Sequence, residues 1–189
     1  MTTSRVFSLA GLALASLVAA TGCGTTSAAG TPGTSDAPVA GDGDLAPPFR
    51  AQTLDGARLD LAHYLGKDVV LVSFWATYCE PCKSEMPSLQ RFHERFAKDG
   101  LTIVSVAMDG PDTKSGVAPY IRKQGYTFAV VIDEDGAITQ ALNPTATAPY
   151  AVLVGRDGRI KKRIAGFQPS EAPAIEAEVE ALVKPARTP

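Results

Sequence analysis

Two cysteines separated by two residues, Cys79 and Cys82, are the residues of this chain best suited to chemistry. Thiols at this spacing can close a small disulfide and open it again, with the thiolate as the nucleophile. The preceding run, 69–75, is apolar and rich in β-branched residues, which is typical of a buried strand, whereas 79–98 has helical spacing. The pair is therefore expected at a helix N-terminus, where free N–H groups and a positive partial charge lower a thiol's pKa. This pattern predicts a thiol–disulfide exchange site.

A Cys-x-x-Cys pair can also be half of a zinc site or a purely structural disulfide. Zinc needs four ligands, and the rest of the chain offers only Cys23, His63 and His93, with no second Cys-x-x-Cys. A structural disulfide would close a loop too short to gain much entropy. Redox function is the favoured interpretation, and neither a metal nor another cofactor is expected.

The first 22 residues have the pattern of a secretion signal. Arg5 supplies a positive charge, and residues 6–20 form an apolar stretch too short for a comfortable transmembrane helix. Small residues then lead to Cys23, so that 1–22 resembles the signal peptide of bacterial lipoproteins, in which such a cysteine receives lipid. An ordinary signal peptide is the alternative. Export would place the pair outside the cytoplasm, lipid-anchored to a bacterial membrane on the periplasmic side or the outer face of the cell membrane, where disulfides persist.

Composition divides the remainder of the chain into three parts. Residues 23–46, the lipidated cysteine and a segment rich in Gly, Ser, Thr, Ala, Pro and Asp, are expected to form a flexible linker. Residues 47–184 are long enough for one domain with one core, and 185–189 form a tail.

The formal net charge is −2 and no basic patch is interleaved with aromatic residues, which argues against nucleic-acid binding. A monomer is expected.

The hydrophobic pattern of the domain predicts alternating strands and helices. Strands are expected at 49–52, 58–59, 69–75, 101–107, 128–132, 150–154 and 159–166, and helices at 61–65, 79–98, 117–124, 137–142 and 170–184. This order implies an α/β fold with a central mixed sheet, helices on both faces, an N-terminal hairpin extension and a central insertion.

The order of elements, with Cys-x-x-Cys at a strand–helix junction, resembles the thioredoxin fold and, more narrowly, the membrane-anchored TlpA/ResA-type thiol–disulfide oxidoreductases. The resemblance covers nearly all of residues 46–184. It is carried by Ala46-Pro47-Pro48-Phe49, by the stretch FWATYCEPCKSEMP at 74–87, by Ala148-Pro149-Tyr150 and by Asp157-Gly158. The active-site stretch is specific, and the other matches are generic.

The resemblance implies roles for individual residues. Cys79 would be the attacking thiol and Cys82 the resolving thiol. Pro149 would be a cis-proline facing the disulfide, a rare bond that exposes neighbouring backbone groups to an extended partner segment. The residues expected to contact the partner or pack beside it are Trp75, Pro81, Ala148 and Pro149.

Two acids, Glu80 and Glu85, match acidic positions in ResA-like proteins. A carboxylate next to a thiolate raises the thiol pKa, so both are candidates for tuning the pair against the helix dipole. The alternative for Glu85 is a favourable acid in the first helical turn. Ser73 stands where thioredoxin carries a buried Asp, so Glu80 or Glu85 is a candidate to substitute for that acid.

The activity implied by the resemblance is reduction of a partner's disulfide through a mixed disulfide with Cys79. The implied partners are an exported disulfide-containing protein, with apocytochrome c before haem attachment as one client, and a transmembrane thiol reductant. One alternative is an oxidase or isomerase for exported proteins, which Pro-His between the cysteines would favour. Others are peroxide reduction, for which a Thr-x-x-Cys arrangement is usual, and a copper-binding assembly factor using both thiolates with Met86 or Met108.

Overall fold

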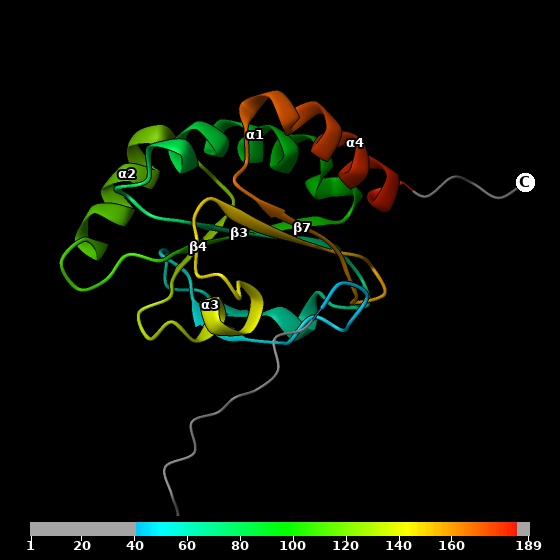
Figure 1. The fold of residues 1–189 in the computed structure, drawn as a ribbon, viewed down its shortest axis with the longest axis horizontal. Coiled ribbons are helices and arrows are strands. Elements are labelled where there is room, and N and C mark those ends of the chain that lie inside the picture. The colour runs from blue at the N-terminus through cyan, green and yellow to red at the C-terminus, as the bar shows by residue number, and fades with distance from the viewer. Residues whose placement is uncertain (1–40, 185–189) are drawn as a thin grey trace, which may run out of the picture. The chain divides into compact units, whose positions relative to one another are not determined.

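A mixed sheet of five strands forms the centre of the protein in a computed structural model that describes residues 41–184 (Figure 1). Its strand order is β5-β4-β3-β6-β7. The strands are β3 (Val69–Trp75), β4 (Leu101–Ala107), β5 (Ala129–Ile132), β6 (Tyr150–Val154) and β7 (Ile160–Ala165). The expectations for the signal peptide, Cys23, most of the linker and the 185–189 tail lie outside the described residues.

The two inner strands β3 and β4 run parallel and in register, from Val69 opposite Leu101 to Trp75 opposite Ala107. β5 continues the sheet parallel to β4, whereas β6 and β7 are antiparallel on the other side of β3. β3 is covered on both faces, so every one of its residues is buried. This burial explains its near-continuous apolar sequence. The carboxyl ends of β3 and β4 finish at the same edge of the sheet, so the segments that follow them meet there.

Helices cover both faces of the sheet, as Figure 1 shows. One face carries α1 (Glu80–Phe96), α2 (Val117–Gln124) and α4 (Ala172–Val183); the other carries α3 (Ala137–Leu142) and the antiparallel hairpin of β1 (Arg50–Gln52) and β2 (Arg58–Asp60). Each face has its own buried apolar cluster. The α/β class, the mixed sheet, the helices on both faces and the N-terminal hairpin predicted from the sequence are confirmed.

Four short 3-10 turns lie beside the longer elements: η1 (Leu61–His63), η2 (Ala97–Asp99), η3 (Lys114–Gly116) and η4 (Pro169–Glu171). Of these, η1, η2 and η4 account for the helix ends that differ from the sequence prediction, whereas α2, which follows η3, has the predicted bounds. The helix expected over 79–98 starts at Glu80, because Cys79 is its extended N-cap residue, and its last turn tightens into η2. The final helix begins only at Ala172, directly before Pro173, which lacks an N–H and suits a first turn.

The chain begins to pack on the domain before residue 47. The backbone N–H of Gly43 donates to the carbonyl of Ile160 at 2.8 Å, and that of Ala46 donates to Gly158 at 2.9 Å. Ala46 is also packed against the domain, since it is only 2 % exposed. Among the helices of residues 41–184, none combines the length and the apolar character that crossing a membrane requires.

Candidate active site

Cys79 and Cys82 are joined by a disulfide bond at the edge of the sheet where β3 ends. Cys79 is the N-cap residue of α1, and its sulfur accepts a hydrogen bond from the backbone N–H of Cys82 at 3.3 Å. The two cysteines differ in exposure, since Cys79 is half-buried and Cys82 is 0 % exposed. A partner approaching from solvent therefore meets Cys79 first.

The two residues between the cysteines are exposed. Pro81 stands in the first turn of α1, where its missing N–H costs no helical hydrogen bond. The carboxylate of Glu80 forms an ion pair with the ammonium of Lys83 at 2.7 Å, with the Glu80 side chain 79 % exposed. Solvent screens such an exposed pair, so that its contribution to stability is small.

Glu85 is buried in the second turn of α1. Its side chain is 2 % exposed, and the hydroxyl of Ser73 on β3 donates to its carboxylate at 3.4 Å. Burial raises the pKa of Glu85 to about 8, and the Ser73 hydrogen bond opposes this shift in part. Residues three apart share a helix face, so Glu85 lies one turn behind Cys82. The carboxyl thus holds a proton at neutral pH beneath the disulfide, unlike an ordinary acid in an exposed first turn.

Trp75 closes β3 beneath the active-site loop. It is 1 % exposed, and its ring centroid lies 5.4 Å from that of Tyr120 on α2. Tyr120 in turn contacts the ring of Tyr126 and lies under the ammonium of Lys83, 5.7 Å from the ring centroid. Trp75 therefore supports the loop from inside the core and has almost no surface for a partner to touch.

The peptide bond between Ala148 and Pro149 is cis. Ala148 is half-buried and packs against the core cluster that contains Cys82, and Pro149 is buried. The preceding loop is held by Asn143, a 1 % exposed residue whose amide nitrogen donates to the carbonyl of Thr147 at 2.7 Å. Asn143 was not a candidate from the sequence, since no motif marks it.

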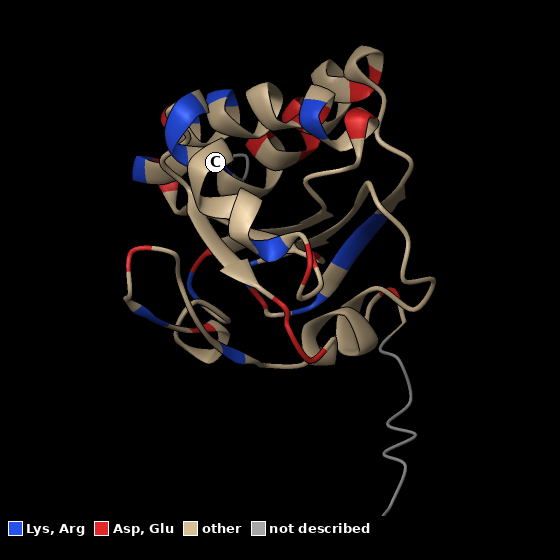
Figure 2. Cartoon of the chain, turned by 90° about the vertical axis from the view of Figure 1, so that its left-hand side faces the viewer, with Lys and Arg blue, Asp and Glu red and all other residues tan. Residues whose placement is uncertain are grey.

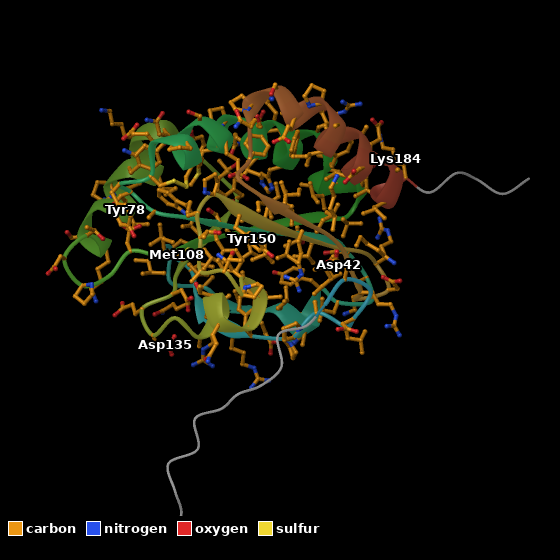
Figure 3. The ribbon with its side chains drawn as sticks, viewed as in Figure 1. Asp42, Tyr78, Met108, Asp135, Tyr150 and Lys184 are labelled. Carbon is orange, nitrogen blue, oxygen red and sulfur yellow. A yellow bond between two sulfur atoms is a disulfide. The ribbon has the colours of Figure 1, made fainter. Side chains whose placement is uncertain are left out.

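A second residue without a sequence motif, Asp109, contacts the active-site loop directly. It follows β4, is 1 % exposed, and accepts hydrogen bonds from both the backbone N–H and the hydroxyl of Thr77. Its neighbour Met108 and the exposed Tyr78 are labelled on the left of Figure 3, at the end of the sheet where β3 and β4 finish. Asp109 is therefore part of the site, although no local pattern singles it out.

Neither methionine suggested as a copper ligand is free beside the sulfurs. Met86 is 1 % exposed within the core cluster, and the sulfur of Met108 accepts from the amide of Asn143 at 3.9 Å. Across residues 41–184, no three His, Cys, Asp or Glu side chains are grouped as a metal site.

Figure 2, which looks at the side of the molecule on the left of Figure 1, shows acidic and basic residues interspersed.

Comparison with known proteins assigns the chain to a family. The model of the AhpC/TSA family matches residues 43–163. The thiol-disulfide oxidoreductase ResA of Bacillus thuringiensis subsp. konkukian is 31 % identical over 129 residues, which cover 68 % of this chain and 72 % of the relative. The chain belongs to the AhpC/TSA family, as a ResA-like thiol–disulfide oxidoreductase.

Solved structures resemble this ResA-like protein over most of their length. A Chlorobium tepidum protein assigned as thiol:disulfide interchange protein DsbE aligns with a TM-score of 0.69 and 25 % identity, over 76 % of this chain and 98 % of that chain. A secreted disulfide oxidoreductase from Mycobacterium tuberculosis aligns with a TM-score of 0.60 and 25 % identity, over 71 % and 96 %. The thioredoxin-like fold and the class of protein-disulfide oxidoreductase expected from the sequence are confirmed.

Proposed function

We propose that this ResA-like protein reduces the disulfides of partner proteins outside the cytoplasm while anchored to a membrane. The observation that carries the proposal is the unequal exposure of the two cysteines, of which Cys79 is half-buried and Cys82 fully buried. An accessible thiol at the helix N-cap is suited to attack a partner, and a buried thiol beside it is suited to resolve the product.

The proposed cycle starts from the dithiol. The Cys79 thiolate attacks one sulfur of the partner's disulfide, a mixed disulfide forms, and the partner's other sulfur leaves and takes up a proton. Cys82 then loses its proton and attacks the sulfur of Cys79, which releases the second partner thiol. Two electrons and two protons pass to the partner, and the Cys79–Cys82 disulfide remains for a transmembrane thiol reductant to reduce.

Glu85 is proposed to tune this cycle. Its desolvated carboxyl, with a pKa of about 8, is able to exchange a proton with the nearby resolving thiol near neutral pH. When Glu85 is ionised, its charge disfavours a thiolate at Cys82. The exposed Glu80 is proposed to act more weakly on Cys79, because its charge is paired with Lys83 and screened by solvent.

These surroundings favour a reductant over a strong oxidant. A strong oxidant has a reduced form that is stabilised, usually as a thiolate. Here the helix N-terminus stabilises a Cys79 thiolate through the N–H of Cys82, but Lys83, the cation nearest in sequence, is paired with Glu80. Behind Cys82 lies an acid rather than a cation.

The midpoint potential of the Cys79–Cys82 pair tests the direction of electron flow. Full-length protein in detergent micelles would be equilibrated with glutathione or dithiothreitol buffers at pH 7, and the dithiol fraction measured by mass spectrometry after alkylation. A potential below about −220 mV lies with thioredoxin and glutaredoxin and supports the reductase. A potential above about −150 mV, towards that of DsbA, contradicts it and indicates a disulfide donor.

Anchoring and partners rest on the N-terminal sequence and on the relatives. Small residues leading to Cys23 support lipidation, and one relative is described as a secreted oxidoreductase. Disulfide-containing exported proteins are the proposed clients, with apocytochrome c among them. Cys23→Ser is expected to shift the protein from the membrane to the soluble fraction. Loss of c-type cytochromes in cells carrying Cys79→Ser would support that client, and an unchanged content would contradict it.

A further inference from the structure

The loop that presents Cys79 is fastened to the end of β4 by one buried carboxylate. In the parallel register Trp75 lies opposite Ala107, so that Thr77 and Asp109 each stand two residues beyond paired strand ends. The backbone N–H of Thr77 donates to the two carboxylate oxygens of Asp109 at 3.0 and 3.3 Å, and the Thr77 hydroxyl donates to one of them.

Breaking the contact between Thr77 and Asp109 would leave a buried carboxylate without hydrogen bonds. Asp109 is 1 % exposed, and among residues 41–184 it has no ion pair with a lysine, arginine or histidine. A buried carboxylate without hydrogen bonds is strongly destabilised, so the Thr77 N–H and hydroxyl must remain directed at it. The carboxylate and the loop therefore fix each other.

The position of Thr77 determines that of Cys79. The N–H of Cys79 donates to the carbonyl of Ala76 at 3.0 Å, which makes Thr77 an inner residue of the turn between β3 and α1. The same turn sets the extended backbone of Cys79 that lets its sulfur accept from the N–H of Cys82. A loosened Thr77 would loosen the hydrogen bond that stabilises a Cys79 thiolate.

The residue before Asp109 links the same strand end to the loop that precedes the cis bond. The N–H of Met108 donates to the carbonyl of Trp75 at 2.8 Å, and its sulfur accepts from the amide nitrogen of Asn143. The same Asn143 nitrogen donates to the carbonyl of Thr147, the residue before the cis pair Ala148-Pro149. Two consecutive residues after β4 thus contact both the active-site loop and Asn143, which holds the loop before the cis bond.

We propose that Asp109 is a positioning residue for Cys79, acting through Thr77 to hold the N-cap geometry in which the thiolate is stabilised. This inference rests on the proposed role of Cys79 as the attacking thiol. Asp109 acts on the Cys79 thiolate through the turn from Ala76 to Cys79, not by contact with the sulfur.

The test is the pH dependence of Cys79 alkylation in reduced full-length protein held in detergent micelles. Iodoacetamide would be the probe, with each modified cysteine assigned by mass spectrometry. The main variant is Thr77→Val, which keeps the Asp109 charge and removes the hydroxyl. Thr77→Ser is the conservative rescue, Asp109→Ala removes the anchor, and the exposed Asp112→Asn is the matched control.

In Thr77→Val the apparent pKa of Cys79 is expected to rise by about one unit, which lowers the thiolate fraction about tenfold at pH values well below that pKa. Thr77→Ser and Asp112→Asn should retain the profile of the unmodified protein. Asp109→Ala removes both the anchor and a charge. If Asp109→Ala does not fold, Thr77→Val alone tests whether the anchor sets the pKa of Cys79.

Two results would overturn the proposal. In the first, Thr77→Val melts at a lower temperature but keeps the Cys79 pH profile, so that Asp109 contributes only stability. In the second, Thr77→Ser loses reactivity as fully as Thr77→Val, so that the hydroxyl is not responsible. Failure of the proposed role of Cys79 is separate, because it would appear in the unmodified protein as preferential alkylation of Cys82. Failure of the reductase direction would appear in the midpoint potential.

Discussion

The hydroxyl of Ser73 on β3 donates a hydrogen bond to the carboxyl of Glu85 on α1 across the core between sheet and helix. Both residues are almost fully buried, at 1 % and 2 % exposure. Desolvation raises the pKa of Glu85 to about 8, and the Ser73 hydrogen bond lowers it only in part. A serine on the strand and an acid on the helix thus form one buried polar contact behind Cys82.

Glu85 makes the oxidised protein less stable as the pH rises from about 5 to 8. In this window the native state keeps a proton on Glu85 that the unfolded state, with an ordinary pKa, releases. Glu85→Gln is expected to remove this slope and to gain a few kcal/mol at pH 8, since one pKa unit corresponds to about 1.4 kcal/mol. Urea unfolding of both proteins at pH 5 and pH 8 measures the difference.

Glu80→Gln is the matched control for that experiment, because Glu80 lies on the same helix but is exposed. It should leave the slope between pH 5 and 8 unchanged. Equal slopes for Glu85→Gln and the unmodified protein would show that Glu85 is ionised in the fold throughout this range.

Ser73→Ala is expected to raise the pKa of Glu85 further. The Ser73 hydroxyl is the group that lowers this pKa, and losing a hydrogen bond of about 1 kcal/mol corresponds to somewhat less than one pKa unit. Titration of the Glu85 carboxyl carbon by NMR measures the shift. Ser84→Ala, which alters an exposed serine of the same helix, should leave the titration unchanged; a fall in the Glu85 pKa on Ser73→Ala would contradict the assignment.

Five elements were predicted from the sequence with the bounds that the structure has: β3, β4, β6, α2 and α3. Long apolar runs define the strands, and left-handed glycines mark several of the breaks: Gly100 ends the turn before β4, and Gly125 ends α2. Such signals are local, so the sequence alone is sufficient for them. The helix ends that differ depend on 3-10 turns, which hydrophobic spacing does not distinguish.

The site was predicted less completely, because its supporting contacts join distant segments. Glu85 was named through a resemblance, although its spacing from Cys82 and Leu89 places it on the buried stripe of α1. That stripe was the available signal for burial. The contact between Asp109 and Thr77 follows only once β3 and β4 are paired in parallel register, which the sequence does not state.

Arg156 is expected to stabilise the end of the molecule opposite the disulfide. Its guanidinium donates to three backbone carbonyls, those of Lys67, Asp99 and Val183, which precede β3, precede β4 and end α4. Arg156→Ala should lower the free energy of unfolding by about 2 kcal/mol or more, since hydrogen bonds from charged groups contribute about 1.5–3 kcal/mol each when well made. Thermal melting followed by circular dichroism measures this loss.

Arg122→Ala is the control for Arg156, because Arg122 is exposed on α2 and has no ion pair within residues 41–184. It should change the melting temperature little. The melting temperature of Arg156→Lys should fall between those of Arg156→Ala and the unmodified protein, since one ammonium cannot reach three separated carbonyls. An unchanged melting temperature for Arg156→Ala would mean that these carbonyls are equally well satisfied by water.

Removing one cysteine at a time should separate attack from resolution. Oxidised glutathione is expected to form a lasting mixed disulfide with Cys79 in the reduced Cys82→Ser variant, because the resolving thiol beside Cys79 is absent. Cys79→Ser leaves the buried Cys82 as the one thiol of the pair, so modification of Cys82 should be slower by about tenfold or more, because access limits exchange. Intact-protein mass spectrometry over time gives both rates, with the unmodified protein expected to pass through the adduct to the internal disulfide. Equal rates in the two variants would mean that the buried position of Cys82 does not protect it, and that the unequal exposure of the sulfurs does not decide which one attacks.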